Sequence, residues 1–150
     1  MPVDVLVETI IERPCAEVAA YAGNPDNAPE WYANIASVEW KTPTTLAAGA
    51  KVAFVARFLG KRLEYTYELV EVAAGQRLVM RTAEGPFPME TTYTWEGLGE
   101  RRTRMTLRNR GEPAGLFRLA GPAMAMAMRR ATSKDLARLK AILEGRASGG

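Results

Sequence analysis

Residues 115–145, GLFRLAGPAMAMAMRRATSKDLARLKAILEG, decide the fold that the sequence predicts. Apolar and small residues recur there at intervals of three and four, and the basic residues lie mostly off this stripe. The stripe comprises Gly121, Ala125, Met128, Thr132, Leu136, Leu139 and Leu143. Proline fits only the first turn of a helix, so the pattern predicts a short helical lead-in over 116–120 and one long amphipathic helix over 122–145.

Most of the chain before this helix alternates apolar and polar residues over short stretches, as strands with one buried face do. The alternation predicts strands at 3–11, 37–41, 51–58, 62–69, 77–82, 90–95 and 102–110. Pro14 ends the first strand and opens a helix over 15–22, and the turn at 24–27 opens a second short helix.

These elements predict an α+β fold, because the apolar face of a sheet has to be buried against another element. We expect a curved antiparallel sheet of seven strands wrapped around the long C-terminal helix, with two short helices after the first strand. We also expect a single domain over 1–145 and a disordered tail at 146–150.

Composition narrows the classes of function. The net charge is +3, and the basic residues form no dense patch with interleaved aromatic residues, so a nucleic-acid partner is not expected. Cys15 is the single cysteine, and no run of about 18 apolar residues occurs. We therefore expect a cytoplasmic protein without an integral membrane segment.

The sequence contains no histidine. This removes the commonest metal ligand, the usual general base at neutral pH and the partner of a serine or cysteine nucleophile. Glycine-rich phosphate-binding motifs are also missing. We therefore expect no metal site and no cofactor.

The order of the predicted elements resembles the helix-grip fold of the START-like, or SRPBCC, superfamily. Residues 11–35, IERPCAEVAAYAGNPDNAPEWYANI, are similar to the opening of that superfamily, with Pro29, Trp31 and Ile35 in an x-P-x-W-x-x-x-I segment. Residues 75–117 resemble strands of its polyketide cyclase/dehydrase-like branch, and Asp135 to Glu144 resemble the terminal helix pattern D-L-x-R-L-K-x-x-L-E. The resemblance implies a ligand cavity between the sheet and the C-terminal helix.

Strand alternation predicts which side chains line this cavity. The candidates are Trp40, Phe54, Phe58, Tyr65, Tyr67, Met80, Tyr93, Trp95, Met105, Leu107 and Asn109 from the strands, with Phe117, Met124 and Met128 from the C-terminal segment. Alternatively, these side chains fill the space by packing on one another. The donors on Tyr65, Tyr67, Tyr93 and Trp95 favour a wet or liganded cavity, because buried donors need partners.

Three functions stay open. The favoured one is a carrier or sensor of a small, largely hydrophobic ligand such as a lipid, an isoprenoid or an aromatic polyketide, whose polar atoms the tyrosines and Asn109 orient. The alternative is a polyketide cyclase/dehydratase-type enzyme, which needs an inward carboxylate as base. Glu30 and Glu90 are the nearest candidates, although a surface position is favoured for both. The third is a co-chaperone-like domain, which would expose an apolar patch.

Overall fold

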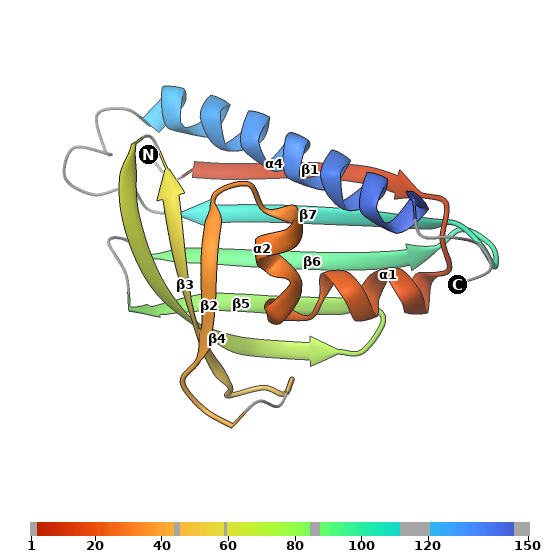
Figure 1. Ribbon diagram of the computed structural model, residues 1–150, viewed down its shortest axis with the longest axis horizontal. Helices are drawn as coiled ribbons and strands as arrows, with labels where there is room; N and C mark the ends of the chain where they lie inside the picture. Colours follow the sequence, from red (N-terminus) through yellow and green to blue (C-terminus); the bar gives the residue numbers. More distant parts are fainter. Residues whose placement is uncertain (1–2, 44–45, 59, 85–87, 112–120, 146–150) are drawn as a thin grey trace.

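The computed structural model describes residues 3–43, 46–58, 60–84, 88–111 and 121–145. Its strands are β1 (Val3–Ile11), β2 (Ile35–Trp40), β3 (Lys51–Phe58), β4 (Lys61–Ala73), β5 (Arg77–Glu84), β6 (Met89–Gly97) and β7 (Thr103–Gly111). Its helices are α1 (Cys15–Ala22), the 3-10 turn η1 (Pro25–Asn27), α2 (Ala28–Trp31) and α4 (Gly121–Gly145). The strands form one antiparallel sheet in the order β1-β7-β6-β5-β4-β3-β2, with the helices on one face (Figure 1). The predicted helix-grip fold is confirmed.

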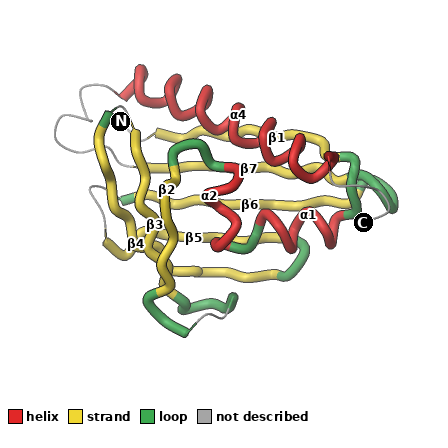
Figure 2. Tube along the Cα trace, in the orientation of Figure 1, coloured by secondary structure: helices red, strands yellow, loops and turns green. Residues whose placement is uncertain are grey.

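The sheet is strongly curved at the end formed by β2, β3 and β4. Pairing between β4 and β5 shifts register at Thr66/Tyr67 and again at Leu69/Glu71, and such irregularities bend a strand and increase its twist. Figure 2 shows β2, β3 and the start of β4 turned steeply away from the direction of β5, β6 and β7. The apolar face is therefore concave, and it receives the helices.

Helix α4 lies along β1, the strand at one edge of the sheet (Figure 1). The Arg129 guanidinium donates to the carbonyl oxygen of Leu6 at 3.1 Å, and Lys140 Nζ donates to that of Ile10 at 2.6 Å. Arg13 Nε, directly after β1, donates to the carbonyl oxygen of Leu143 at 2.8 Å, which satisfies a carbonyl in the last turns of the helix. These hydrogen bonds fix α4 against β1. They also protect the edge of β1 from pairing with another strand.

The core has two parts. The larger part packs α1, α2 and the second half of α4 on the sheet, and it contains the fully buried Trp31, Met105, Leu136 and Leu139. The smaller part, made of Val3, Val5, Met124 and Met128, lies between β1 and the first half of α4. The two parts leave the middle of the concave face for the candidate site.

The predicted bounds of β1 and α1 agree with the structure, whereas several other strands extend further than predicted. Strand β4 continues to Ala73 rather than ending at 69, because Val72 still packs on the core after the second register shift. Strand β2 begins at Ile35 rather than at 37, with an irregularity between Ile35 and Ser37. The helical lead-in predicted at 116–120 and the tail predicted at 146–150 lie outside the described residues. Among the described helices, none combines the length and the hydrophobicity that a membrane span requires.

Substitution of Leu139 tests how much the packing of α4 on the sheet stabilises the fold. The Leu139→Ala variant should lose about 2–5 kcal/mol of unfolding free energy, because this fully buried side chain fills space between helix and sheet. Urea denaturation followed by far-UV circular dichroism measures the loss. Met126→Ala is the matched control on the same helix, since Met126 is 67% exposed, and it should change the free energy by less than about 0.5 kcal/mol. Equal effects of the two substitutions would contradict the packing described above.

Candidate functional site

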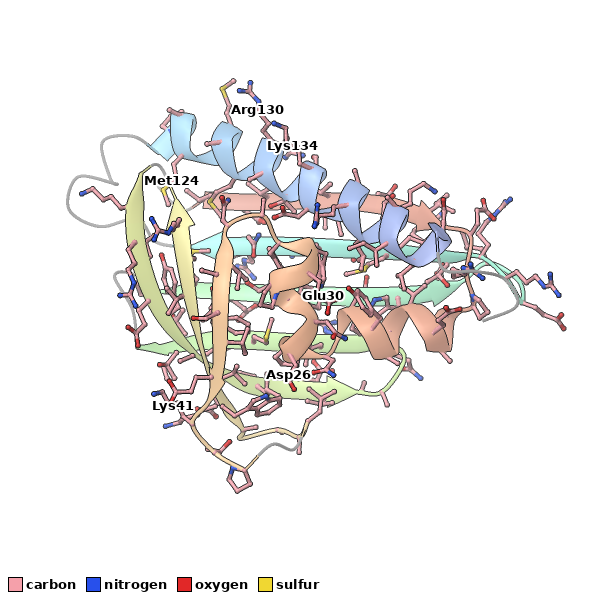
Figure 3. All side chains as sticks on the ribbon, in the orientation of Figure 1. Asp26, Glu30, Lys41, Met124, Arg130 and Lys134 are labelled. Carbon is pink, nitrogen blue, oxygen red and sulfur yellow. The ribbon has the colours of Figure 1, made fainter. Side chains whose placement is uncertain are left out.

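A cavity of about 150 Å³ lies between the concave face of the sheet and the first half of α4. Side chains from the strands β2 to β7, from the segment between α2 and β2 and from α4 surround it, and most of the surface they offer is apolar. The described lining residues are Tyr32, Asn34, Ile35, Phe54, Ala56, Leu63, Tyr65, Tyr67, Met80, Met89, Thr91, Tyr93, Asn109, Met124, Met128, Ala131, Thr132 and Asp135. The cationic side of α4 faces elsewhere, because Figure 3 shows Arg130 and Lys134 projecting away from the sheet.

Eight of the side chains that the sequence predicted for the cavity lie on its wall. They are Phe54, Tyr65, Tyr67, Met80, Tyr93, Asn109, Met124 and Met128. The strand residues among them occupy alternate positions, so that each strand presents every second side chain to the concave face. That these side chains bind a ligand stays a prediction.

The other candidates lie elsewhere. Met105 and Leu107 are fully buried in the larger core, and Trp95 packs beside Gly23 at the end of α1. The end of α1 covers Trp95, and all three side chains belong to the packed core instead of lining the cavity. The indole N–H of Trp95 has no hydrogen-bond partner among the described residues, and it therefore gives no support to a wet pocket.

Trp40 was also expected at the cavity, but it lies outside the lining. Its Nε1 donates to Asp26 Oδ1 at 2.8 Å, which turns the indole toward η1 at the end of β2. Phe117 and the side chain of Phe58 lie outside the part of the chain that the structure describes.

Ten of the described lining residues were not predicted from the sequence, and Asp135 is the one carboxylate among them. It lines the cavity from α4, is only 4% exposed, and accepts a hydrogen bond from the backbone N–H of Ala33 at 3.0 Å. Burial raises the pKa of this carboxyl to about 6, against the opposing effects of the Ala33 hydrogen bond and of Arg138. A signal was present in the sequence, because Asp135 follows Thr132 by three residues and precedes Leu139 by four, which places it on the buried stripe.

The two carboxylates considered as candidate bases, Glu30 and Glu90, lie outside the cavity. This agrees with the surface positions that the sequence favoured for both. Glu30 is exposed and bonded to the hydroxyl of Tyr21. Glu90 pairs with Arg81 at 2.8 Å on the other face of the sheet from its neighbour Thr91, which lines the cavity. The carboxylate that lines the cavity is Asp135 instead.

Tyrosine hydroxyls supply most of the remaining polar atoms. The hydroxyl oxygens of Tyr32 and Tyr93 lie 2.5 Å apart, and the hydroxyl of Thr91 donates to Asn109 Oδ1 at 2.8 Å. Burial raises the pKa of Tyr67 to about 12 and, as the largest cause, raises the pKa of both Tyr32 and Tyr93 as well. These phenols therefore keep their protons at neutral pH and remain hydrogen-bond donors.

The described lining residues include no lysine or arginine, and the described chain contains no group of three or more Cys, Asp or Glu side chains that could hold a metal ion. The arrangement therefore offers an apolar body of space with one carboxylate and several phenols. It can hold a largely apolar molecule, orient a polar group on it, and accept a proton at Asp135.

The buried carboxylate should make stability depend on pH. Folded Asp135 holds its proton up to about pH 6, whereas an unfolded aspartate loses it near about 3.9, so ionisation between these values disfavours the folded state. The Asp135→Asn variant keeps the acceptor for Ala33 but has no charge. Its unfolding free energy relative to wild type should rise by on the order of 3 kcal/mol between pH 4 and pH 8, measured by urea denaturation. Asp26→Asn, at an exposed position, should show no such rise. If the unfolding free energy of Asp135→Asn relative to wild type were the same at pH 4 and at pH 8, the carboxylate would not be buried.

Comparisons with known proteins agree with this architecture. The chain has 16% sequence identity and a TM-score of 0.84 to the Zhui aromatase/cyclase from Streptomyces sp. R1128, covering 100% of this chain and 99% of that one. It has 21% identity and a TM-score of 0.82 to a protein from Thermus thermophilus, covering 96% and 99%. A START superfamily protein from Mycobacterium smegmatis matches at 14% identity and a TM-score of 0.72, covering 98% of each chain.

A comparison with the sequences of curated proteins found no match. The family model described as polyketide cyclase / dehydrase and lipid transport matches residues 2–144, nearly the whole chain. This confirms the resemblance found in the sequence: the chain belongs to the polyketide cyclase / dehydrase and lipid transport family.

Proposed function

We propose that the chain binds a small, largely hydrophobic ligand between the sheet and α4, as a carrier or sensor. The observation that carries the proposal is the mostly apolar cavity of about 150 Å³ whose wall contains one carboxylate and several phenols. Pockets that combine an apolar lining with a few converging polar groups are the usual form of a small-molecule site. The family description, which includes lipid transport, supports the same function.

The size of the cavity limits the ligand. An apolar cavity of about 150 Å³ in another protein takes up benzene, so a molecule with one ring fits this space as it stands. A lipid tail, an isoprenoid or a polyketide of several rings would need the cavity to widen or would leave part of the molecule outside it. The flexible thioethers of Met124 and Met128, which line the cavity from α4, are suited to such adjustment.

Met128 provides the test of this location. Paired native and denaturing mass spectrometry of the purified protein should show a small apolar molecule that is released on unfolding, and NMR titration should show uptake of benzene. Met128→Trp should abolish both, because the larger side chain fills the cavity, and the circular dichroism of the fold should stay unchanged. Met126→Trp, on the exposed side of α4, is the control and should bind as the wild type does. Retained binding by Met128→Trp would refute the proposed location.

Asp135 favours a second candidate function, an enzyme that forms an enolate, as aldol cyclases and dehydratases do. In this mechanism the Asp135 carboxylate takes the proton from the carbon next to a ketone, and the electrons of that C–H bond move onto the carbonyl oxygen. A phenol of the Tyr32–Tyr93 pair donates a hydrogen bond to that oxygen. A carboxylate with a pKa of about 6 is ionised at neutral pH and is a stronger base than an ordinary aspartate.

Hydrogen exchange tests this candidate without knowledge of the natural substrate. In D₂O at pH 7.5, the protein should accelerate loss of the methyl proton signal of acetophenone, followed by ¹H NMR. The Asp135→Asn variant should reduce the acceleration by about 100-fold or more, since the base is removed. Asp26→Asn should leave it unchanged. Exchange at the buffer rate with wild-type protein would remove the support for this candidate and leave the binding function in place.

The co-chaperone-like function has the least support. Among the described residues, the exposed large apolar side chains are spread over four parts of the fold: Leu6 and Ile10 on β1, Leu46 in the segment before β3, Val70 on β4 and Met126 on α4. Single exposed apolar side chains are ordinary on protein surfaces, whereas a partner site is expected to gather them.

A further inference from the structure

Three polar side chains belong to the cavity wall: Asp135 of α4, Tyr93 of β6 and Tyr32, which directly follows α2. We call the part of the cavity that they border its polar end. The two hydroxyl oxygens are 2.5 Å apart, and the backbone N–H of Ala33 holds Asp135 Oδ1 at 3.0 Å. Burial first, and the nearby Asp135 charge in addition, raise the pKa of both phenols. Because Ala33 directly follows Tyr32, its hydrogen bond brings the Asp135 carboxylate near the phenol pair, and within the described residues no hydrogen bond joins the carboxylate to either phenol.

This end of the cavity has hydrogen-bonding groups that the described residues leave without partners. One of the two phenol protons is used within the Tyr32–Tyr93 pair, and the other is available for an acceptor. The second carboxylate oxygen of Asp135, Oδ2, has no hydrogen-bond partner among the described residues. One donor and one acceptor therefore share the same partly enclosed space, and leaving both unsatisfied costs free energy.

We infer that this end of the cavity recognises a hydroxyl group carried on an aromatic ring. The ligand O–H donates to Oδ2 of Asp135, its oxygen accepts the remaining proton of the Tyr32–Tyr93 pair, and the ring occupies the apolar part of the cavity. The ligand class is thus a small phenol. The inference rests on the proposed function, because it specifies the ligand of the same cavity.

Other head groups satisfy this end less well. An ether or a ketone accepts a hydrogen bond but gives none to Oδ2. A protonated amine donates but leaves the tyrosine proton unsatisfied, and it brings a charge into an apolar space. A carboxylate would face Asp135 without a lysine or arginine among the described lining residues. A hydroxyl is the smallest group that donates and accepts at once.

The experiment compares four probes of similar size, phenol, anisole, toluene and benzylamine, by NMR titration of the wild-type protein at pH 8. Phenol should bind at least about tenfold more tightly than anisole, as expected for a hydrogen bond to a charged group. Equal binding of phenol and toluene would overturn the inference and leave the cavity as a site. Tightest binding of benzylamine would also overturn it. Failure of all four probes to bind would count against the proposed function itself.

The Asp135→Asn variant should reverse the preference. Ala33 fixes the amide, because its N–H needs the carbonyl oxygen, so the NH₂ group takes the place of Oδ2 and turns an acceptor into a donor. Phenol should lose about tenfold in affinity, anisole should gain, and toluene should stay within about twofold. Asp26→Asn is the matched control and should keep the wild-type order. Unchanged phenol binding by Asp135→Asn would contradict the inference.

Wild-type protein gives a second readout that needs no substitution. Lowering the pH from 8 to 4.5 protonates Asp135, whose pKa is about 6, so that Oδ2 no longer acts as a free carboxylate acceptor. The neighbouring phenols of Tyr32, Tyr67 and Tyr93 stay protonated in this range, because burial raises the pKa of each. The preference for phenol over anisole should therefore shrink at pH 4.5. A ratio that does not change with pH would overturn the inference.

Discussion

The contact between α4 and β1 is the constraint on which the rest of the structure depends. Arg129 and Lys140 of the helix bond to carbonyl oxygens on the free edge of β1, so α4 is fastened along one side of the sheet. On the other side, β2, β3 and the start of β4 curve away because β4 changes register against β5. A straight helix held at one edge cannot follow a surface that bends away from it. The cavity is therefore a consequence of how the helix is attached, and not of missing volume in individual side chains.

The carboxylate of Asp135 lowers the stability of the fold in comparison with an apolar side chain at the same position. A leucine at this position would extend the apolar stripe that buries Leu136, Leu139 and Leu143. A carboxylate there loses hydration, and the hydrogen bond from Ala33 offsets only part of that loss, as the raised pKa of about 6 shows. Groups with such shifts lie at functional sites more often than elsewhere, because chemistry and recognition use what stability disfavours. The Asp135 carboxylate and the Tyr32–Tyr93 pair belong to the same cavity wall, so the carboxylate could act on a ligand there.

Alternation along the strands, together with the helical spacing of the C-terminal segment, was sufficient to predict the fold and about half of the cavity wall, because both patterns depend only on the regular repeat of a local backbone conformation. It could not tell which side chains on the concave face line a cavity and which fill a core. Tyr93 and Trp95 illustrate the limit, since they are two residues apart on β6 and point to the same side. Tyr93 borders the open space, whereas α1 covers Trp95. The difference comes from where α1 packs, which the pattern within β6 does not contain.

Asp135 was missed for a related reason. Helical spacing gives the direction of a side chain around the axis, and this direction places Asp135 between Thr132 and Leu139 on the inward side. An aspartate in that direction is ordinarily disfavoured, because a helix in close contact with a sheet would bury the charge among apolar groups. Helix α4 contacts β1 closely but leaves a space above β3, β4 and β5, and the carboxylate borders that space with one oxygen unbonded among the described residues. The gap that makes a cavity possible is therefore also what allows a carboxylate on the inner face of the helix, and sequence patterns alone do not report the distance between two packed elements.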